Sequence, residues 1–280
     1  MSEPLQRYTI EYPTGMGAVV IAVAALGCGP RIVMLPSVGR DVDDFFPVAR
    51  RLAEAGYRVL MPSPRGIGDS RGPLSGIGLG DLAADVAEVI RQDQDQDQDQ
   101  GERRSGKTTP GAVVAGHAFG NWIARMAAAC HPELIRAVIL LAAAHRDFPA
   151  RLRDTIDRIM DTTRSRVERL ADLQDAFFAP GHAADDWLEG WHPQVALAQR
   201  QAARATAAAT WWTAGGVPLL DLQASHDPFA PRSGASLLRD ELGARVSIEL
   251  IDDAGHALLP EQPARVADAI ARYMARLDTH

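Results

Sequence analysis

The chain has 280 residues, 46% of them hydrophobic, and a formal net charge of −7. This length is enough for the core of one large α/β domain with an inserted subdomain. Lys and Arg are spread along the chain without a dense block, which together with the negative charge argues against nucleic acid or an anionic membrane as a partner. The expected partner is a small-molecule substrate, and the sequence leaves the oligomeric state open.

Two cysteines, Cys28 and Cys130, are too few for a disulfide framework, and no histidines or acidic residues have the spacing of a metal site. The N-terminus lacks the charged segment and apolar run of a secretory signal. No apolar stretch approaches the about 18 residues that a membrane span needs. We therefore expect a cytoplasmic protein without metal or cofactor.

The first third of the chain predicts strands of a sheet. Residues 8–26 have the pattern of two strands joined by a turn at residues 13–15. Residues 32–35 are a short apolar run, typical of a parallel strand buried on both faces. A loop at residues 36–41 leads into a helix, and residues 57–61 predict the next strand.

Two glycine-rich segments follow that strand, at residues 66–68 and 76–80. A dinucleotide-binding fingerprint needs its glycines between a first strand and a helix, with an acidic residue about 20 positions further on. This order is not met, so the sequence indicates no nucleotide cofactor.

Residues 81–91 place apolar side chains at helical spacing, with Asp81 as a candidate N-terminal cap. From residue 92 to 100 the sequence alternates Asp and Gln, and residues 101–107 add no apolar side chain. Such a tract buries too little to offset its ordering entropy, so we expect a solvated, mobile loop.

The next segment organises the rest of the chain. An apolar strand at residues 113–115 runs through Gly116-His117-Ala118-Phe119-Gly120 into an Ala-rich helix. This stretch resembles the strand, elbow and helix of the α/β-hydrolase family, in which a G-x-S-x-G motif carries the nucleophile on a tight, strained turn. Both glycines are in place here, but Ala118 occupies the nucleophile position.

The remaining elements fit the same resemblance. Residues 137–141, 217–224 and 246–251 are further candidate strands, whereas residues 147–213 show only helical spacing. The resemblance implies an α/β-hydrolase fold with a mostly parallel eight-stranded sheet, helices on both faces and an inserted helical cap. The core would comprise residues 1–146 and 214–280, and the cap residues 147–213.

Two loops after the last strands carry the residues that the family uses beside its nucleophile. Asp227 stands in an Asp-Pro turn and His256 in an Ala-Gly-His segment, in the family's chain order. A carboxylate that accepts the imidazole Nδ1–H fixes the ring's tautomer and leaves Nε2 as a base. The resemblance also implies an oxyanion hole formed by the backbone N–H groups of Val38 and Phe119.

Ala118 divides the functional hypotheses, because a methyl group cannot attack a carbonyl. Either a serine enzyme carries an engineered Ser→Ala change, or the native chain works without an elbow nucleophile. Ser37, in the oxyanion loop, could act as a relocated nucleophile or contact the substrate, or it could cap the helix that begins near Asp41. His145, at the end of a strand, is a further candidate substrate contact.

Aromatic side chains concentrate near the expected cap. We expect some of the tryptophans to line an apolar substrate pocket. The candidates are Trp122, Trp187, Trp191, Trp211 and Trp212.

The first hypothesis is an enzyme that acts on a small apolar carbonyl compound, and the favoured reaction is hydrolysis of an ester or a lactone. The resemblance includes members that use the histidine as a base without an acyl-enzyme, so a lyase or a cofactor-free oxygenase is the alternative. A non-catalytic small-molecule binding protein is the third.

Overall fold

The computed structural model describes residues 4–99, 111–144 and 149–279. Its strands form one eight-stranded sheet in the order β1-β2-β4-β3-β5-β6-β7-β8. The strands are β1 (Gln6–Thr14), β2 (Gly17–Leu26), β3 (Arg31–Leu35), β4 (Arg58–Pro62), β5 (Ala112–His117), β6 (Ile135–Leu141), β7 (Leu219–Ala224) and β8 (Val246–Ile251). β2 runs antiparallel to both β1 and β4, and all other neighbours are parallel. The predicted mostly parallel sheet is confirmed.

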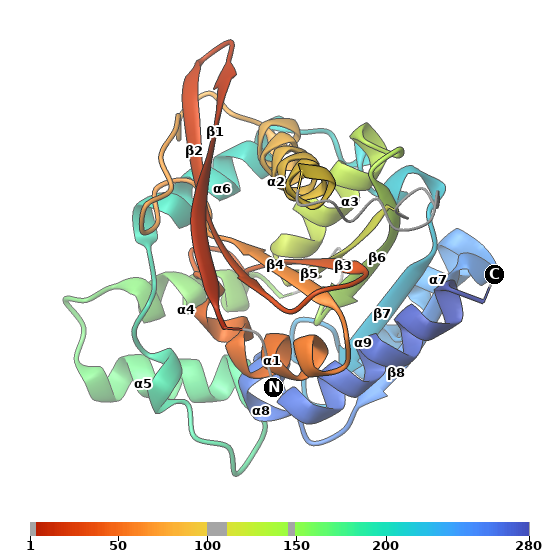
Figure 1. Cartoon of the computed structure of the whole chain (residues 1–280). Helices are drawn as coiled ribbons and strands as arrows, with labels where there is room; N and C mark the ends of the chain where they lie inside the picture. The colour runs from red at the N-terminus through yellow and green to blue at the C-terminus, as the bar shows by residue number, and fades with distance from the viewer. Residues whose placement is uncertain (1–3, 100–110, 145–148, 280) are drawn as a thin grey trace.

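Helices cover both faces of this sheet (Figure 1). The helices are α1 (Phe46–Glu54), α2 (Leu79–Asp99), α3 (Gly120–Cys130), α4 (Ala150–Met160), α5 (Arg166–Phe177), α6 (Pro193–Ala205), α7 (Leu237–Leu242), α8 (Leu258–Glu261) and α9 (Pro263–Leu277). α2 and α3 pack on one face, and α1 and α9 on the other.

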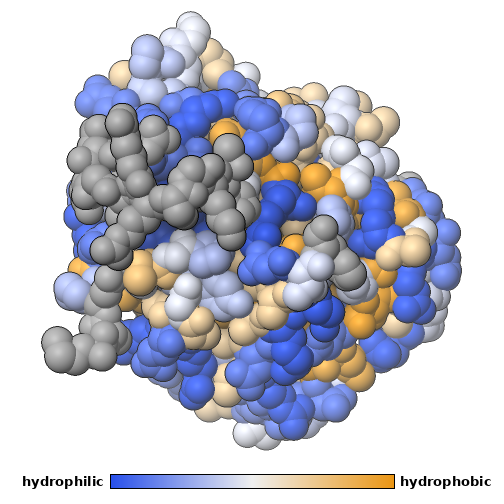
Figure 2. Space-filling model, turned by 45° about the vertical axis from the view of Figure 1, so that its right-hand side comes forward, coloured by the Kyte–Doolittle hydropathy of each residue, from blue (hydrophilic) through white to orange (hydrophobic). Residues whose placement is uncertain are grey.

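The central strands are apolar on both sides because both faces are covered. In β3, Val33 and Leu35 face the core under α2 and α3, whereas Ile32 and Met34 face the core under α1 and α9. On the molecular face in Figure 2, hydrophilic side chains predominate and hydrophobic ones appear in smaller areas between them. Among the described residues, no helix combines the length and apolarity needed to cross a bilayer.

The segment expected to form a cap contains helices in its described part, residues 149–213. α4, α5 and α6 lie between β6 and β7 in the chain. This segment is bound to the loop after β3, because the backbone N–H of His192 donates to the Gly39 carbonyl at 2.8 Å. The Gly39 N–H in turn donates to Oε1 of Gln199 at 2.8 Å.

The structure corrects the expected start of the loop at the Asp-Gln tract. We expected a loop from residue 92, but α2 continues to Asp99. The reason is Asp93, a buried residue whose carboxylate pairs with Arg31 at 2.6 Å and with Arg58 at 3.0 Å. At the other end of α2, Asp81 accepts from the Gly78 N–H at 2.8 Å and so lies inside the first turn rather than ahead of it.

Candidate active site

The elbow has the strained backbone that its motif predicts. Ala118 has φ of +46°, in the left-handed region that costs an alanine about 1–2 kcal/mol. The flanking glycines are required by close packing: a Cβ on Gly116 would lie 2.3 Å from the backbone of Gly120. A Cβ on Gly120 would lie 2.3 Å from the Leu35 carbonyl oxygen. α3 therefore approaches β5 and β3 closely, and the tight turn between them is fixed.

His256 and Asp227 lie together, as the family resemblance implies. The Nδ1 atom of His256 is 2.9 Å from Oδ2 of Asp227, and both residues are buried. The other carboxylate oxygen accepts the Phe229 N–H at 2.8 Å. Because a carboxylate accepts hydrogen bonds, Nδ1 carries the proton and Nε2 is left as a base.

The loop that carries His256 is held by α8. The carboxylate of Glu261 accepts the Gly255 N–H at 2.7 Å and the Ala179 N–H at 2.6 Å. Burial raises the pKa of this carboxyl, and the two N–H donors oppose that shift. Glu261 thus joins the histidine loop to the segment that follows α5.

His117 lies behind the base and does not share its role. Its Nε2 atom is 2.8 Å from the backbone carbonyl oxygen of His256, to which it donates. Burial, with a smaller contribution from His256, lowers the pKa of His117 to about 3. The ring is therefore neutral at physiological pH and supports the His256 backbone.

The two expected oxyanion-hole residues border one cavity. Val38 and Phe119 both line it together with Ala118 and His256. Neither the Val38 N–H nor the Phe119 N–H donates to an acceptor among the described residues. These two N–H groups are thus available to a substrate oxygen.

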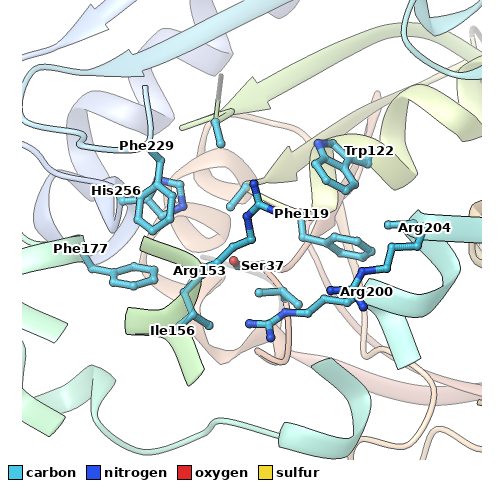
Figure 3. A pocket seen from close by; sticks show the side chains of 14 residues that line it. Ser37, Phe119, Trp122, Arg153, Ile156, Phe177, Arg200, Arg204, Phe229 and His256 are labelled. Carbon is cyan, nitrogen blue, oxygen red and sulfur yellow. The ribbon is translucent and has the colours of Figure 1, made fainter. Parts of the chain in front are cut away.

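The cavity has a volume of about 340 Å³, at the lower end of the range for small-ligand sites. Most of its lining is apolar (Figure 3). The apolar residues are Val38, Ala118, Phe119, Trp122, Ala144, Ile156, Phe177, Ala203 and Phe229. The polar ones are Ser37, Arg153, Arg200, Arg204 and His256.

Ser37 lies at this cavity and is buried, with its hydroxyl directed into the space shown in Figure 3. It does not cap the following helix. The 3-10 helix Val42–Phe45, which precedes α1, is capped by Asp41, whose carboxylate accepts the Val42 N–H at 2.7 Å. His145, the other candidate contact, lies outside the described residues.

The structure places only one of the five candidate tryptophans in the lining. Trp122 lines the cavity, and Trp211 stacks behind it with ring centroids 5.3 Å apart. Trp187 packs against His117, and Arg40 lies 4.5 Å and 4.9 Å from the ring centroids of Trp187 and Trp191.

Trp212 instead packs against Arg125, whose Cζ atom lies 4.5 Å from the centroid of the Trp212 ring. We expected some of the five candidate tryptophans to line the cavity; Trp122 does, and Trp187, Trp191, Trp211 and Trp212 lie outside its lining. These rings hold the cap segment on the core, because their large apolar surfaces fill the space between the two.

Three arginines in the lining were missed by sequence reasoning. Arg153 lies on α4, and Arg200 and Arg204 lie one turn apart on α6. The available signal was the spacing of four residues between Arg200 and Arg204, which places both on one face of a helix. Among the described residues, no group of three or more His, Cys, Asp or Glu side chains could hold a metal ion.

Comparison with known proteins gives a family match. A model of the alpha/beta hydrolase family matches residues 32–269. No curated protein matches the chain.

Several solved structures share the fold. An esterase from Exiguobacterium antarcticum is similar with a TM-score of 0.74 and 22% identity, over 95% of this chain and 99% of that protein. A thermophilic esterase from Thermogutta terrifontis, solved with malate bound, has a TM-score of 0.69 and 19% identity, over 97% of this chain and 98% of that protein. A bromoperoxidase from Bacillus anthracis has a TM-score of 0.72 and 17% identity, over 96% and 100%. Identities this low show the shared fold alone.

Proposed function

Because the chain belongs to the α/β-hydrolase family, we propose that it is an enzyme whose His256–Asp227 pair acts as a general base at the carbonyl of a small ester or lactone. The supporting observation is the buried 2.9 Å contact between these side chains, at the edge of a cavity that Ala118 also lines. An oriented imidazole beside a cavity is what general-base catalysis needs, and it does not depend on a serine.

In the proposed reaction, a water molecule takes the part of the missing nucleophile. Nε2 of His256 removes a proton from the water, and the oxygen attacks the carbonyl carbon. The N–H groups of Val38 and Phe119 stabilise the resulting oxyanion. The tetrahedral intermediate then expels the alkoxide, which takes the proton back from the imidazolium. No acyl-enzyme forms.

The first test is hydrolysis of a panel of aryl esters and lactones by the wild type and by His256→Ala. Loss of a general base lowers the rate by about 10²–10⁴-fold, so the variant should fall by that factor. Asp227→Asn should also reduce the rate, because it no longer fixes the tautomer. Equal rates in the wild type and His256→Ala would refute the proposed site.

The second test restores the motif. Ala118→Ser should raise ester hydrolysis by orders of magnitude and produce a burst of released alcohol, since in serine proteases loss of the nucleophile costs about 10⁶ in kcat. The wild type should show no burst. If Ala118→Ser has no effect while His256→Ala abolishes a lyase or oxygen-consuming reaction, the alternative enzyme class is favoured. Ligand binding without turnover in any variant would favour a binding protein.

Ser37 needs a separate test, because its buried hydroxyl shares the cavity with His256. If it were a relocated nucleophile, a fluorophosphonate should label it, as mass spectrometry would detect. The proposed water mechanism predicts no adduct and retained activity in Ser37→Ala.

A further inference from the structure

We propose that the substrate of this site carries an anionic group, which Arg200 and Arg204 of α6 bind on the side of the cavity away from His256. The inference rests on the proposed function for the identity of the reacting end. Its recognition step is independent of turnover.

The polar groups of the cavity come from two parts of the chain. His256 and the N–H groups of Val38 and Phe119 belong to loops at the sheet, whereas the three arginines come from α4 and α6. In Figure 3, Arg153 extends from the helix of Ile156, and Arg200 and Arg204 extend from the helix on the other side of the view. A substrate bound here would have its carbonyl near His256 and another group near the guanidinium groups of Arg200 and Arg204, which lie away from His256 in Figure 3.

The charged side chains of the lining favour an anionic group on the substrate. The described lining contains three guanidinium groups and no carboxylate, although the chain as a whole has a net charge of −7. Guanidinium groups stay protonated in proteins and match carboxylate or phosphate oxygens with paired N–H donors. Arg200 is paired with Asp157, whereas Arg204 pairs with no described residue, so a substrate anion would neutralise a positive charge that the described lining leaves open.

Arg200 has a hydrogen-bond donor that no described residue satisfies. Its Nη1 atom pairs with Asp157 of α4, which fixes the side chain between the two helices. Its Nη2 atom is buried and has no hydrogen-bond partner among the described residues. Buried donors are normally satisfied, so this N–H group lacks the partner that an anionic oxygen reaching it would supply.

The apolar side chains in the middle of the cavity indicate the chemistry of the substrate between its two polar groups. Trp122, Ile156, Phe177 and Phe229 line the same space as the polar ends. We infer a short apolar or aromatic linker between the carbonyl and the anionic group. This changes the expectation of a wholly apolar substrate.

The experiment measures binding by calorimetry with three unreactive ligands of one phenylalkyl skeleton, ending in a carboxylate, a phosphate or a neutral amide. The wild type should bind an anion at least about tenfold more tightly than the amide, because hydrogen bonds to charged groups are the stronger ones. Which anion binds best identifies the group. Equal affinity for all three ligands would overturn the proposal.

The variants separate recognition from a structural role. Arg204→Gln and Arg200→Gln should lower the preference for the anion and leave the affinity for the amide within about twofold. Arg204 is exposed and pairs with no described residue, so its variant keeps the fold even if loss of the Asp157 contact unsettles Arg200→Gln. Arg239→Gln, exposed on α7, is the control and should match the wild type. An unchanged preference in both cavity variants would contradict the proposal.

His256→Ala distinguishes this inference from the proposed function. It should lower turnover by about 10²–10⁴-fold and retain the preference for the anion. If no ester is hydrolysed by any form, but the wild type still prefers the anion and Arg204→Gln does not, the proposed function fails and the anion site stands.

Discussion

At the scale of single residues, Ala118 is held in a left-handed conformation, with φ of +46°, that an alanine does not favour. The tight packing of Gly116 and Gly120 imposes this turn. Because the same turn presents the N–H of Phe119 to the cavity, the strain has a use even without a nucleophilic side chain. This supports a site whose chemistry depends on the oxyanion hole and on His256.

His117 should make the stability of the protein depend on pH. Its pKa is lowered to about 3 in the folded state, against about 6.5 when unfolded, so the unfolded state binds an extra proton between these values. The stabilisation is complete above pH 6.5 and is lost as the pH falls. From pH 7 to 5 this single group should cost about 2 kcal/mol of unfolding free energy.

Urea unfolding of the wild type and of His117→Gln, at pH 8, 7, 6 and 5, measures that contribution. The variant will be less stable throughout, but its loss between pH 7 and 5 should be smaller by up to about 2 kcal/mol. Between pH 8 and 7 the two curves should run in parallel. The same dependence on pH in both proteins would mean that His117 titrates normally in the folded state.

At the scale of elements, the strands and the elbow could be predicted from sequence because their signals are local. Apolar runs, glycine spacing and the order Asp227, His256 are all visible in the chain. The extension of α2 was not, because its cause is long-range: Asp93 pairs with Arg31, on a strand 62 positions earlier. In the repeat, nothing distinguishes Asp93 from Asp95.

Comparison of these two aspartates tests that explanation. Asp93→Ala removes the buried carboxylate that pairs with both Arg31 and Arg58 and should destabilise the protein by about 3–5 kcal/mol. Asp95→Ala is the matched control, since Asp95 is exposed on the same helix, and should cost under about 0.5 kcal/mol. Urea midpoints and helix content measured by circular dichroism check both. Similar effects of the two changes would refute the explanation.

At the scale of the whole molecule, the sequence predicted that His256, Val38 and Phe119 meet at one cavity, but it did not indicate which tryptophan lines it and missed the arginines. The sheet edge could be inferred because parallel strands bring their ends together. No such rule fixes how α4 and α6 pack over that edge. Composition indicated aromatic packing there, but it did not distinguish a ring behind the wall, such as Trp187, from one in it, such as Trp122.

One side chain, Arg40, connects the core with the cap segment. It is buried, and its Nε and Nη2 atoms pair with Asp44 at 2.9 Å and 2.6 Å. Its Nη1 atom donates to the backbone carbonyls of Trp187 and Glu189. A lysine keeps the charge but lacks the planar fork that makes these contacts together.

Arg40→Lys should therefore loosen the cap segment and weaken the whole fold. The carbonyl and carboxylate groups left unsatisfied predict a loss of about 1–3 kcal/mol in urea unfolding. Limited proteolysis should cut faster within residues 149–213 than in the wild type, as peptide mass mapping would locate. Arg71→Lys, at a side chain 66% exposed, is the control and should change neither measurement. If Arg40→Lys is cut and unfolds like the wild type, other contacts, such as Gly39 with Gln199, hold the cap segment in place.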